Sequence, residues 1–202
     1  SATDTTFNGA AVQTTGSLTT TGTGTTTLNS VGTIGGSETV HAGTLLVNGA
    51  QTATGNIGYT TTGPTTITQA LTTTPGSNGT VTFTNAGLLT LAAAGDISAD
   101  GAVTQNGAGA VSTAGDITTT NDAVSLATAV TLTGPVSLAT GAGPGDITFA
   151  GPVDGGQALT LAAGTGNVLF GDSVGGATPL ASVTVASATD TTFNGAAVQT
   201  TG

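Results

Sequence analysis

Aspartates are the residues in this sequence whose type and spacing offer the clearest chemistry. Five of them open short segments of similar pattern, and they are Asp4, Asp96, Asp116, Asp146 and Asp190. If such segments stack as neighbouring strands, the carboxylates of Asp96 and Asp116 lie about 5 Å apart. Like charges this close repel one another unless they share a cation, and Ca²⁺ prefers carboxylate oxygens. Asp96 and Asp116 are therefore the candidate Ca²⁺ ligands.

Turn formation is the alternative role of these aspartates, and it is the one that the sequence favours. Gly directly precedes Asp96, Asp116 and Asp146, and an Asp at a corner accepts hydrogen bonds from backbone N–H groups. The chain lacks the dense G-G-x-G-x-D nonapeptide of Ca²⁺-binding solenoids. We therefore predict corner aspartates and no catalytic, cofactor or metal site beyond the candidate pair.

Enzymatic chemistry has little support in the sequence. The single His, His41, lies three residues after Glu38, and no G-x-S-x-G nucleophile motif is present. Asp96 and Asp100 are four residues apart, but a polysaccharide-cleaving site needs clustered carboxylates, usually with Lys or Arg beside them. We predict that the protein is not an enzyme, and a polysaccharide-active β-helix is the enzymatic alternative.

Composition restricts the partners of the chain. Its 202 residues include no Lys or Arg and ten acidic residues, which give a formal net charge of -10. Binding to nucleic acid or to an anionic membrane surface depends on Lys and Arg. The apolar runs are also too short to span a bilayer. We predict no nucleic-acid partner and no membrane insertion.

A six-residue sequence pattern recurs along the chain and predicts short strands. Asp, Thr or Asn comes first, an apolar residue is frequent second and fourth, and Thr or Ser is frequent third. The segments are Asp4–Gly9, Thr25–Ser30, Thr44–Gly49, Thr80–Asn85, Asp96–Gly101, Asp116–Asn121, Asp146–Gly151, Asn167–Asp172 and Asp190–Gly195. Alternation with a period of two places the apolar side chains inward and the Thr side chains outward.

The spacing of these segments predicts an all-β parallel β-solenoid of about nine rungs of about 20 residues each. One long step of 36 residues conceals a weaker rung near 65–68, and one of 30 residues contains either a bulged loop or two short rungs. Parallel crossovers are overwhelmingly right-handed, so we expect a right-handed β-helix. An antiparallel sandwich is the alternative, because Asn-Gly pairs favour hairpins. Outward Thr pairs such as Thr25 and Thr27 suggest an ice-binding solenoid as a further alternative, although the column of outward Thr side chains is interrupted along the chain.

The first and last sixteen residues, 1–16 and 187–202, are identical at an offset of 186 residues. We interpret residues 1–186 as one tandem β-solenoid repeat unit and 187–202 as the start of the next identical repeat. The two segments are then expected in the same conformation at equivalent places on one axis, about nine rungs apart. A translation that does not close generates a filament, so the predicted partner is the protein itself, by tandem or head-to-tail continuation.

Four phrases of the pattern AGDIT carry a family resemblance. They are AGDIS at 94–98, AGDIT at 114–118, PGDIT at 144–148 and TGNVL at 165–169. The sequence resembles bacterial β-strand-repeat surface proteins of the filamentous-haemagglutinin-like and autotransporter-passenger-like kind. This resemblance implies an extracellular or cell-surface structural repeat of a fibre, sheath or surface layer. The alternative is a stalk segment of a large secreted adhesin whose binding tip lies elsewhere.

Overall fold

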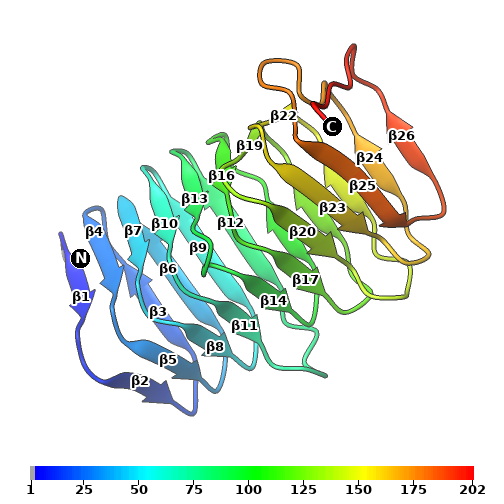
Figure 1. Cartoon of the computed structure of the whole chain (residues 1–202). Helices are drawn as coiled ribbons and strands as arrows, with labels where there is room; N and C mark the ends of the chain where they lie inside the picture. The colour runs from blue at the N-terminus through cyan, green and yellow to red at the C-terminus, as the bar shows by residue number, and fades with distance from the viewer. Residues whose placement is uncertain (1–2) are drawn as a thin grey trace.

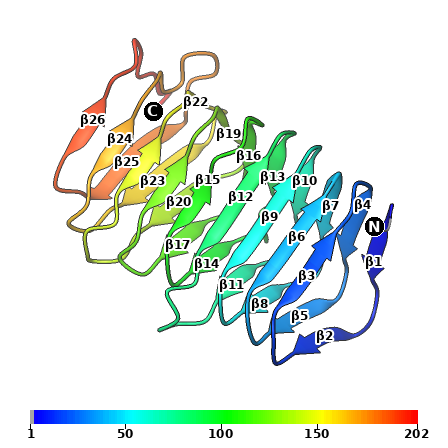
Figure 2. The ribbon, with the colours of Figure 1, turned by 180° about the vertical axis from the view of Figure 1, so that it is seen from behind.

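Strands of two to six residues, joined by corners rich in Gly, Asn and Asp, form the regular structure of this chain. A computed structural model describes residues 3–202, which contain 26 strands and no helix. Every pairing is parallel, and a strand pairs with the strands one turn before and after it. The result is a β-solenoid of about nine turns with about 21 residues per turn. Figures 1 and 2 show the stacked coils from two sides, with the first and last coils at opposite ends.

Each coil contributes one strand to each of three sheets, which we call the first, second and third faces. The first face consists of β1 (Thr5–Phe7), β4 (Thr25–Leu28), β7 (Thr44–Val47), β10 (Thr65–Ile67), β13 (Leu89–Leu91), β16 (Val111–Thr113), β19 (Val130–Leu132) and β22 (Val153–Asp154). Isolated parallel bridges extend this face from Val153 to Val174 and from Val174 to Val198.

The other two faces contain nine strands each. The second face consists of β2 (Ala11–Thr14), β5 (Val31–Ile34), β8 (Gln51–Ala53), β11 (Leu71–Thr73), β14 (Ile97–Ala99), β17 (Ile117–Thr119), β20 (Val136–Ala139), β23 (Ala158–Ala162) and β25 (Ser182–Ser187). The third face consists of β3 (Leu18–Thr21), β6 (Glu38–Ala42), β9 (Ile57–Thr61), β12 (Val81–Asn85), β15 (Val103–Gln105), β18 (Val124–Leu126), β21 (Ile147–Phe149), β24 (Val168–Phe170) and β26 (Thr191–Phe193).

The predicted inward ladders are confirmed. Ile97 and Ile117 are neighbours on the second face and are 1% and 2% exposed. Phe149 stacks on Phe170 with ring centroids 5.2 Å apart, and Phe170 stacks on Phe193 at 4.7 Å. Each fully buried side chain of this size contributes about 1.5–3 kcal/mol through removal of apolar surface from water. Parallel stacking of like residues therefore builds the core along the axis.

The expectation of one shared column for the six-residue segments is wrong. Thr25–Leu28 lies on the first face, Ile97–Ala99 on the second, and Ile147–Phe149 on the third. The six-residue pattern describes any short strand whose alternate side chains point into the core, so it recurs on all three faces. The weaker rung expected near 65–68 is confirmed as β10. The 30-residue step from Thr119 to Phe149 contains neither a bulged loop nor two short rungs. It joins a strand on the second face to a strand on the third, so its two ends do not lie in one column.

The antiparallel alternative is also excluded within residues 3–202, because each strand pairing there is parallel. The Asn-Gly pairs lie at corners between faces. Asn78, for example, adopts a φ of 54° at a corner that precedes β12. Left-handed backbone of this kind suits Asn, whose short side chain tolerates it.

The expected placement of the two identical segments is wrong as well. The Thr-Thr-Phe strand of residues 1–16 is β1 on the first face, where it pairs with β4. The same strand of residues 187–202 is β26 on the third face, where it pairs with β24. Both copies form a strand, a corner and a second extended stretch, but they lie on different sides of the solenoid (Figure 1).

Candidate functional site: an aspartate file on the third face

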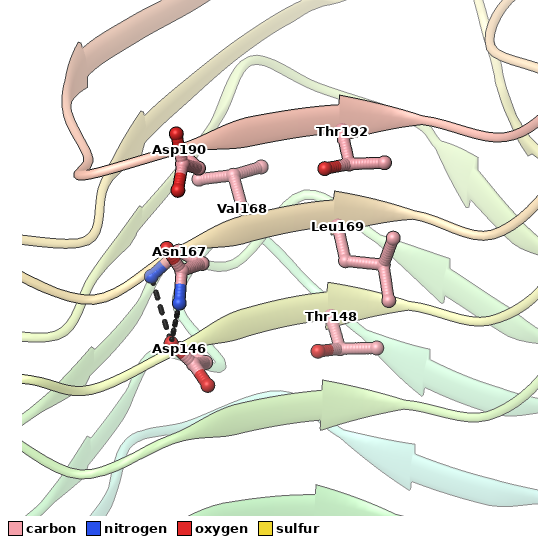
Figure 3. Close-up of a pocket in the computed structure, with 7 residues that line it drawn as sticks. All are labelled: Asp146, Thr148, Asn167, Val168, Leu169, Asp190 and Thr192. Carbon is pink, nitrogen blue, oxygen red and sulfur yellow. Dashed lines mark hydrogen bonds between the residues drawn. The ribbon is translucent and has the colours of Figure 1, made fainter.

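Three neighbouring strands of the third face bring polar side chains into a file on the outside of the solenoid. Asp146, Asn167 and Asp190 each stand directly before β21, β24 and β26, so parallel pairing places them one above another. Figure 3 shows this file beside a second one, which is formed by Thr148, Leu169 and Thr192. Together with Val168, these side chains line a depression of about 350 Å³.

Side-chain hydrogen bonds link two members of the aspartate file, Asp146 and Asn167, on adjacent coils. The carboxylate Oδ1 of Asp146 accepts a bond from the backbone N–H of Asn167 at 2.7 Å and another from its Nδ2 at 3.2 Å (Figure 3). Asn167 separates the carboxylates of Asp146 and Asp190 by two coils, which is about 10 Å. One Ca²⁺ ion cannot bridge that distance, because its ligands lie 2.3–2.6 Å from the ion.

The same bond recurs on the other faces. The Oδ1 of Asp4 accepts the backbone N–H of Thr25 at 2.7 Å. On the second face, Asp96 accepts the N–H of Asp116 at 2.8 Å, and Asp116 accepts the N–H of Ser137 at 2.8 Å. A carboxylate on one coil therefore satisfies a corner N–H on the next coil. Four of the aspartates thus show the corner chemistry predicted from the sequence, namely Asp4, Asp96, Asp116 and Asp146. The five aspartates occupy three columns and not one.

Asp96 and Asp116, the candidate Ca²⁺ ligands, are neighbours as predicted. One oxygen of each carboxylate is already engaged with backbone. Ca²⁺ takes six to eight oxygen ligands, and residues 3–202 contain no group of three or more His, Cys, Asp or Glu that could hold a metal ion. The pair thus offers two carboxylates without a third acidic ligand.

The residues considered for enzymatic chemistry do not converge. Glu38 and His41 belong to the same strand, β6, but Glu38 faces the core and His41 faces outward. Asp100 accepts the backbone N–H of Asn78 at 2.6 Å at the corner before β12. Hydrogen bonds from the backbone N–H groups of Asn78 and Gly76 lower the pKa of Asp100. Its carboxylate is therefore engaged in holding a corner, whereas Asp96 lies on an exposed one.

The sequence analysis missed a buried carboxyl inside the first coils. The side chain of Glu38 is 0% exposed, and the hydroxyl of Tyr59 donates a hydrogen bond to its Oε1 at 3.0 Å. Its Oε2 has no hydrogen-bond partner among the described residues. Burial raises the pKa of Glu38 to about 7, and the bond from Tyr59 opposes this shift in part. Alternation could have revealed it, because Glu38 shares the inward register of Val40 and Ala42.

The chain matches no protein-family model, and searches of curated proteins and of solved structures give no significant match. The resemblance to bacterial surface repeats therefore stays a prediction. No helix in residues 3–202 has the length and hydropathy of a membrane span. What the fold defines is a three-faced parallel β-solenoid whose polar side chains link one coil to the next.

Proposed function

We propose that this chain is a structural repeat of an extracellular β-solenoid fibre, which builds a filament, sheath or surface layer. The observation that carries the proposal is the relation between β1 and β26. Both strands have the same sequence, and within residues 3–202 each has a neighbour on one edge only: β4 for β1, and β24 for β26. Unpaired parallel edges of identical sequence suit continuation by further coils.

The side-chain chemistry of the faces supports a mechanical role. In the aspartate file the Asp146 carboxylate accepts a hydrogen bond from backbone of the adjacent coil, and the aromatic side chains stack along the axis. Both interactions hold coils together. The depression on the third face lies beside the Asp146–Asn167 bonds, so one of the two carboxylates in its lining, that of Asp146, is already hydrogen-bonded.

The extracellular setting of the proposal rests on composition. The chain has neither Lys nor Arg, which removes the cleavage sites of trypsin-like proteases, and it has no Cys whose state depends on the redox compartment. Solenoids also expose their strand edges only at their ends, which suits a long repeat in a dilute and protease-rich medium.

Electron microscopy of a polypeptide that carries three consecutive 186-residue copies tests the proposal. The expected image is a straight, unbranched rod that lengthens by about 42 Å per copy, given a rise of about 4.8 Å per coil. A chain of separate globular beads would show that each copy closes on itself, and the fibre proposal would then be wrong.

A further inference from the structure

The two identical segments measure the length of the repeat in turns of the solenoid. From β1 to β26 the chain passes through 26 steps between adjacent faces, if Val174 is counted as the place of the first face between β24 and β25. Three steps make one turn, so the 186-residue offset corresponds to eight and two-thirds turns. A whole number of turns would have returned β26 to the first face.

The Thr-Thr-Phe strand occurs twice, as β1 and β26, and each copy shows the pairing on one of its two edges. On its later edge, β1 pairs with β4 and aligns Phe7 with Leu28. The same contact includes the bond from the Thr25 N–H to Asp4 and one at 2.5 Å from the Nδ2 of Asn29 to the Oδ1 of Asn8. These contacts define how the sequence D-T-T-F-N receives the following coil.

On its earlier edge, β26 pairs with β24 and aligns Phe193 with Phe170. The aromatic rings stack there at 4.7 Å with an interplanar angle of 5°. The opposite side of Phe193 is uncovered, and the residue is 41% exposed. Val198, in the last stretch on the first face, is 50% exposed. An apolar surface and a free strand edge therefore coincide on the last coil.

The equivalent glycines Gly9 and Gly195 also have different surroundings in the two copies. A Cβ on Gly195 would lie 2.2 Å from the backbone carbon of Asp172 on the coil below, so this corner requires Gly. A Cβ on the equivalent Gly9 would meet nothing closer than 3.7 Å. The requirement for Gly in this segment comes from an underlying coil, which β26 has among the described residues and β1 does not.

We infer that the uncovered edge of β26 binds the coil of a second copy of this repeat that is equivalent to residues 17–30. The second copy's Thr25–Leu28 pairs with β26 as β4 pairs with β1, and its Leu28 covers Phe193. The Oδ1 of Asp190 receives the N–H of that copy's Thr25. The occupant continues the same polypeptide, so this inference rests on the fibre proposed above.

A rotation follows from the same arrangement. Because one copy spans eight and two-thirds turns, the next copy is turned by one third of a turn relative to the first, in the frame of the three faces. Three copies, or 26 turns, restore the original face after about 125 Å. Each file of outward side chains then occurs on all three sides of the fibre, which makes the sides chemically equivalent over that length.

A disulfide experiment tests the seam in a chain in which Gly202 is followed by a second copy of residues 17–202. Thr6 aligns with Thr27 in β1 and β4, so the equivalent pair is Thr192→Cys and the second copy's Thr27→Cys. Neighbouring Cα atoms at about 4.8 Å suit a disulfide. We expect near-complete cross-linking on mild oxidation, as for the control pair Thr6→Cys and Thr27→Cys of the first copy. The pair Leu169→Cys and the second copy's Thr27→Cys lies two coils apart and should not cross-link.

Two further readouts separate this inference from the proposed function. In the extended chain, hydrogen exchange at the amides of Thr191 and Phe193 should slow by about tenfold or more relative to the 202-residue chain, because these amides face the edge that becomes paired. Helical reconstruction of a multi-copy rod should give a rise of about 42 Å with a rotation of one third of a turn. A continuous rod without the Thr192 cross-link or without this rotation would overturn the seam and leave the fibre standing. Separate beads would overturn both.

Discussion

The first and last coils of this solenoid carry the same sixteen residues on two different cores. Near β1 the interior contains the buried Glu38 and its bond to Tyr59, whereas β26 lies on the stack of Phe149 and Phe170. In both places the segment forms a strand, a corner and an extended stretch. Local sequence thus determines the shape of the segment, and the number of residues between the copies determines the face that it joins.

The comparison also distinguishes the contacts that a side chain makes with the coil before it from those that it makes with the coil after it. Phe7 has Leu28 above it and is half-buried, whereas Phe193 has Phe170 below it and is 41% exposed. A side chain in the middle of the solenoid has both neighbours. The contribution of each position to stability should therefore depend on its place in the stack more than on its residue type.

Truncation of the stacked phenylalanines should give the largest effect. Phe170→Ala removes a fully buried ring between two others, and we expect a loss of about 3–5 kcal/mol in the free energy of unfolding. Phe193→Ala removes a ring with one open side and should cost clearly less than half of that. Denaturant titration of both variants measures the difference. Equal losses would mean that the last coil is as well covered as the interior.

The pH dependence of stability should distinguish the core near β1, which contains Glu38, from the core near β26. Glu38 has a pKa of about 7 in the folded chain, above its ordinary value of 4.5. Protonated Glu38 favours folding, so its contribution is complete below pH 4.5 and is lost as the pH rises to 7 and beyond. The shift corresponds to about 3 kcal/mol.

Glu38→Gln isolates this effect, because the amide mimics the protonated acid. We expect the variant and the parent chain to unfold with similar free energies at pH 4.5. At pH 8 the variant should be more stable by about 3 kcal/mol. A pH-independent difference between the two proteins would show that the pKa of Glu38 is the same in the folded and unfolded chains.

Alanine at the repeated glycine should affect only one copy. Gly195→Ala forces a Cβ into the backbone of Asp172 and should destabilise the chain by about 1–3 kcal/mol, as overpacking does. Gly9→Ala has room and should change stability by less than about 0.5 kcal/mol. Thermal unfolding of the two variants provides the comparison. In a chain with a preceding copy, we expect Gly9→Ala to become as costly as Gly195→Ala.

The corner aspartates should show the smallest contrast. Asp4→Ala removes the acceptor for the Thr25 N–H and should cost about 1 kcal/mol, which is typical of a lost hydrogen bond. The carboxylate of Asp190 makes no hydrogen bond within the described residues, where only its backbone carbonyl accepts the Val168 N–H, so Asp190→Ala should be close to neutral in this chain. Hydrogen exchange at the Thr25 amide gives a local measure, which should respond to the first substitution alone.

Much of the fold could be predicted from the sequence, because alternation and stacking are local rules that repeat. The inward Ile and Phe ladders, the parallel coils and the strand at 65–67 followed from them. The three faces did not, since a strand such as Ile97–Ala99 and one such as Ile147–Phe149 follow the same six-residue pattern on different sheets. Glu38 was missed because a charged residue is not expected in an inward position, although its alternation with Val40 and Ala42 places it there.

The placement of the two identical segments on different faces is the central claim, and spin-label proximity tests it most directly. Nitroxide labels at Thr148→Cys and Thr192→Cys lie on the third face two coils apart, or about 10 Å. We predict dipolar broadening of the continuous-wave spectrum for this pair and none for labels at Thr131→Cys and Thr192→Cys, since Thr131 lies on the first face. Broadening for the Thr131 pair in place of the Thr148 pair would put both copies on one face and contradict the account.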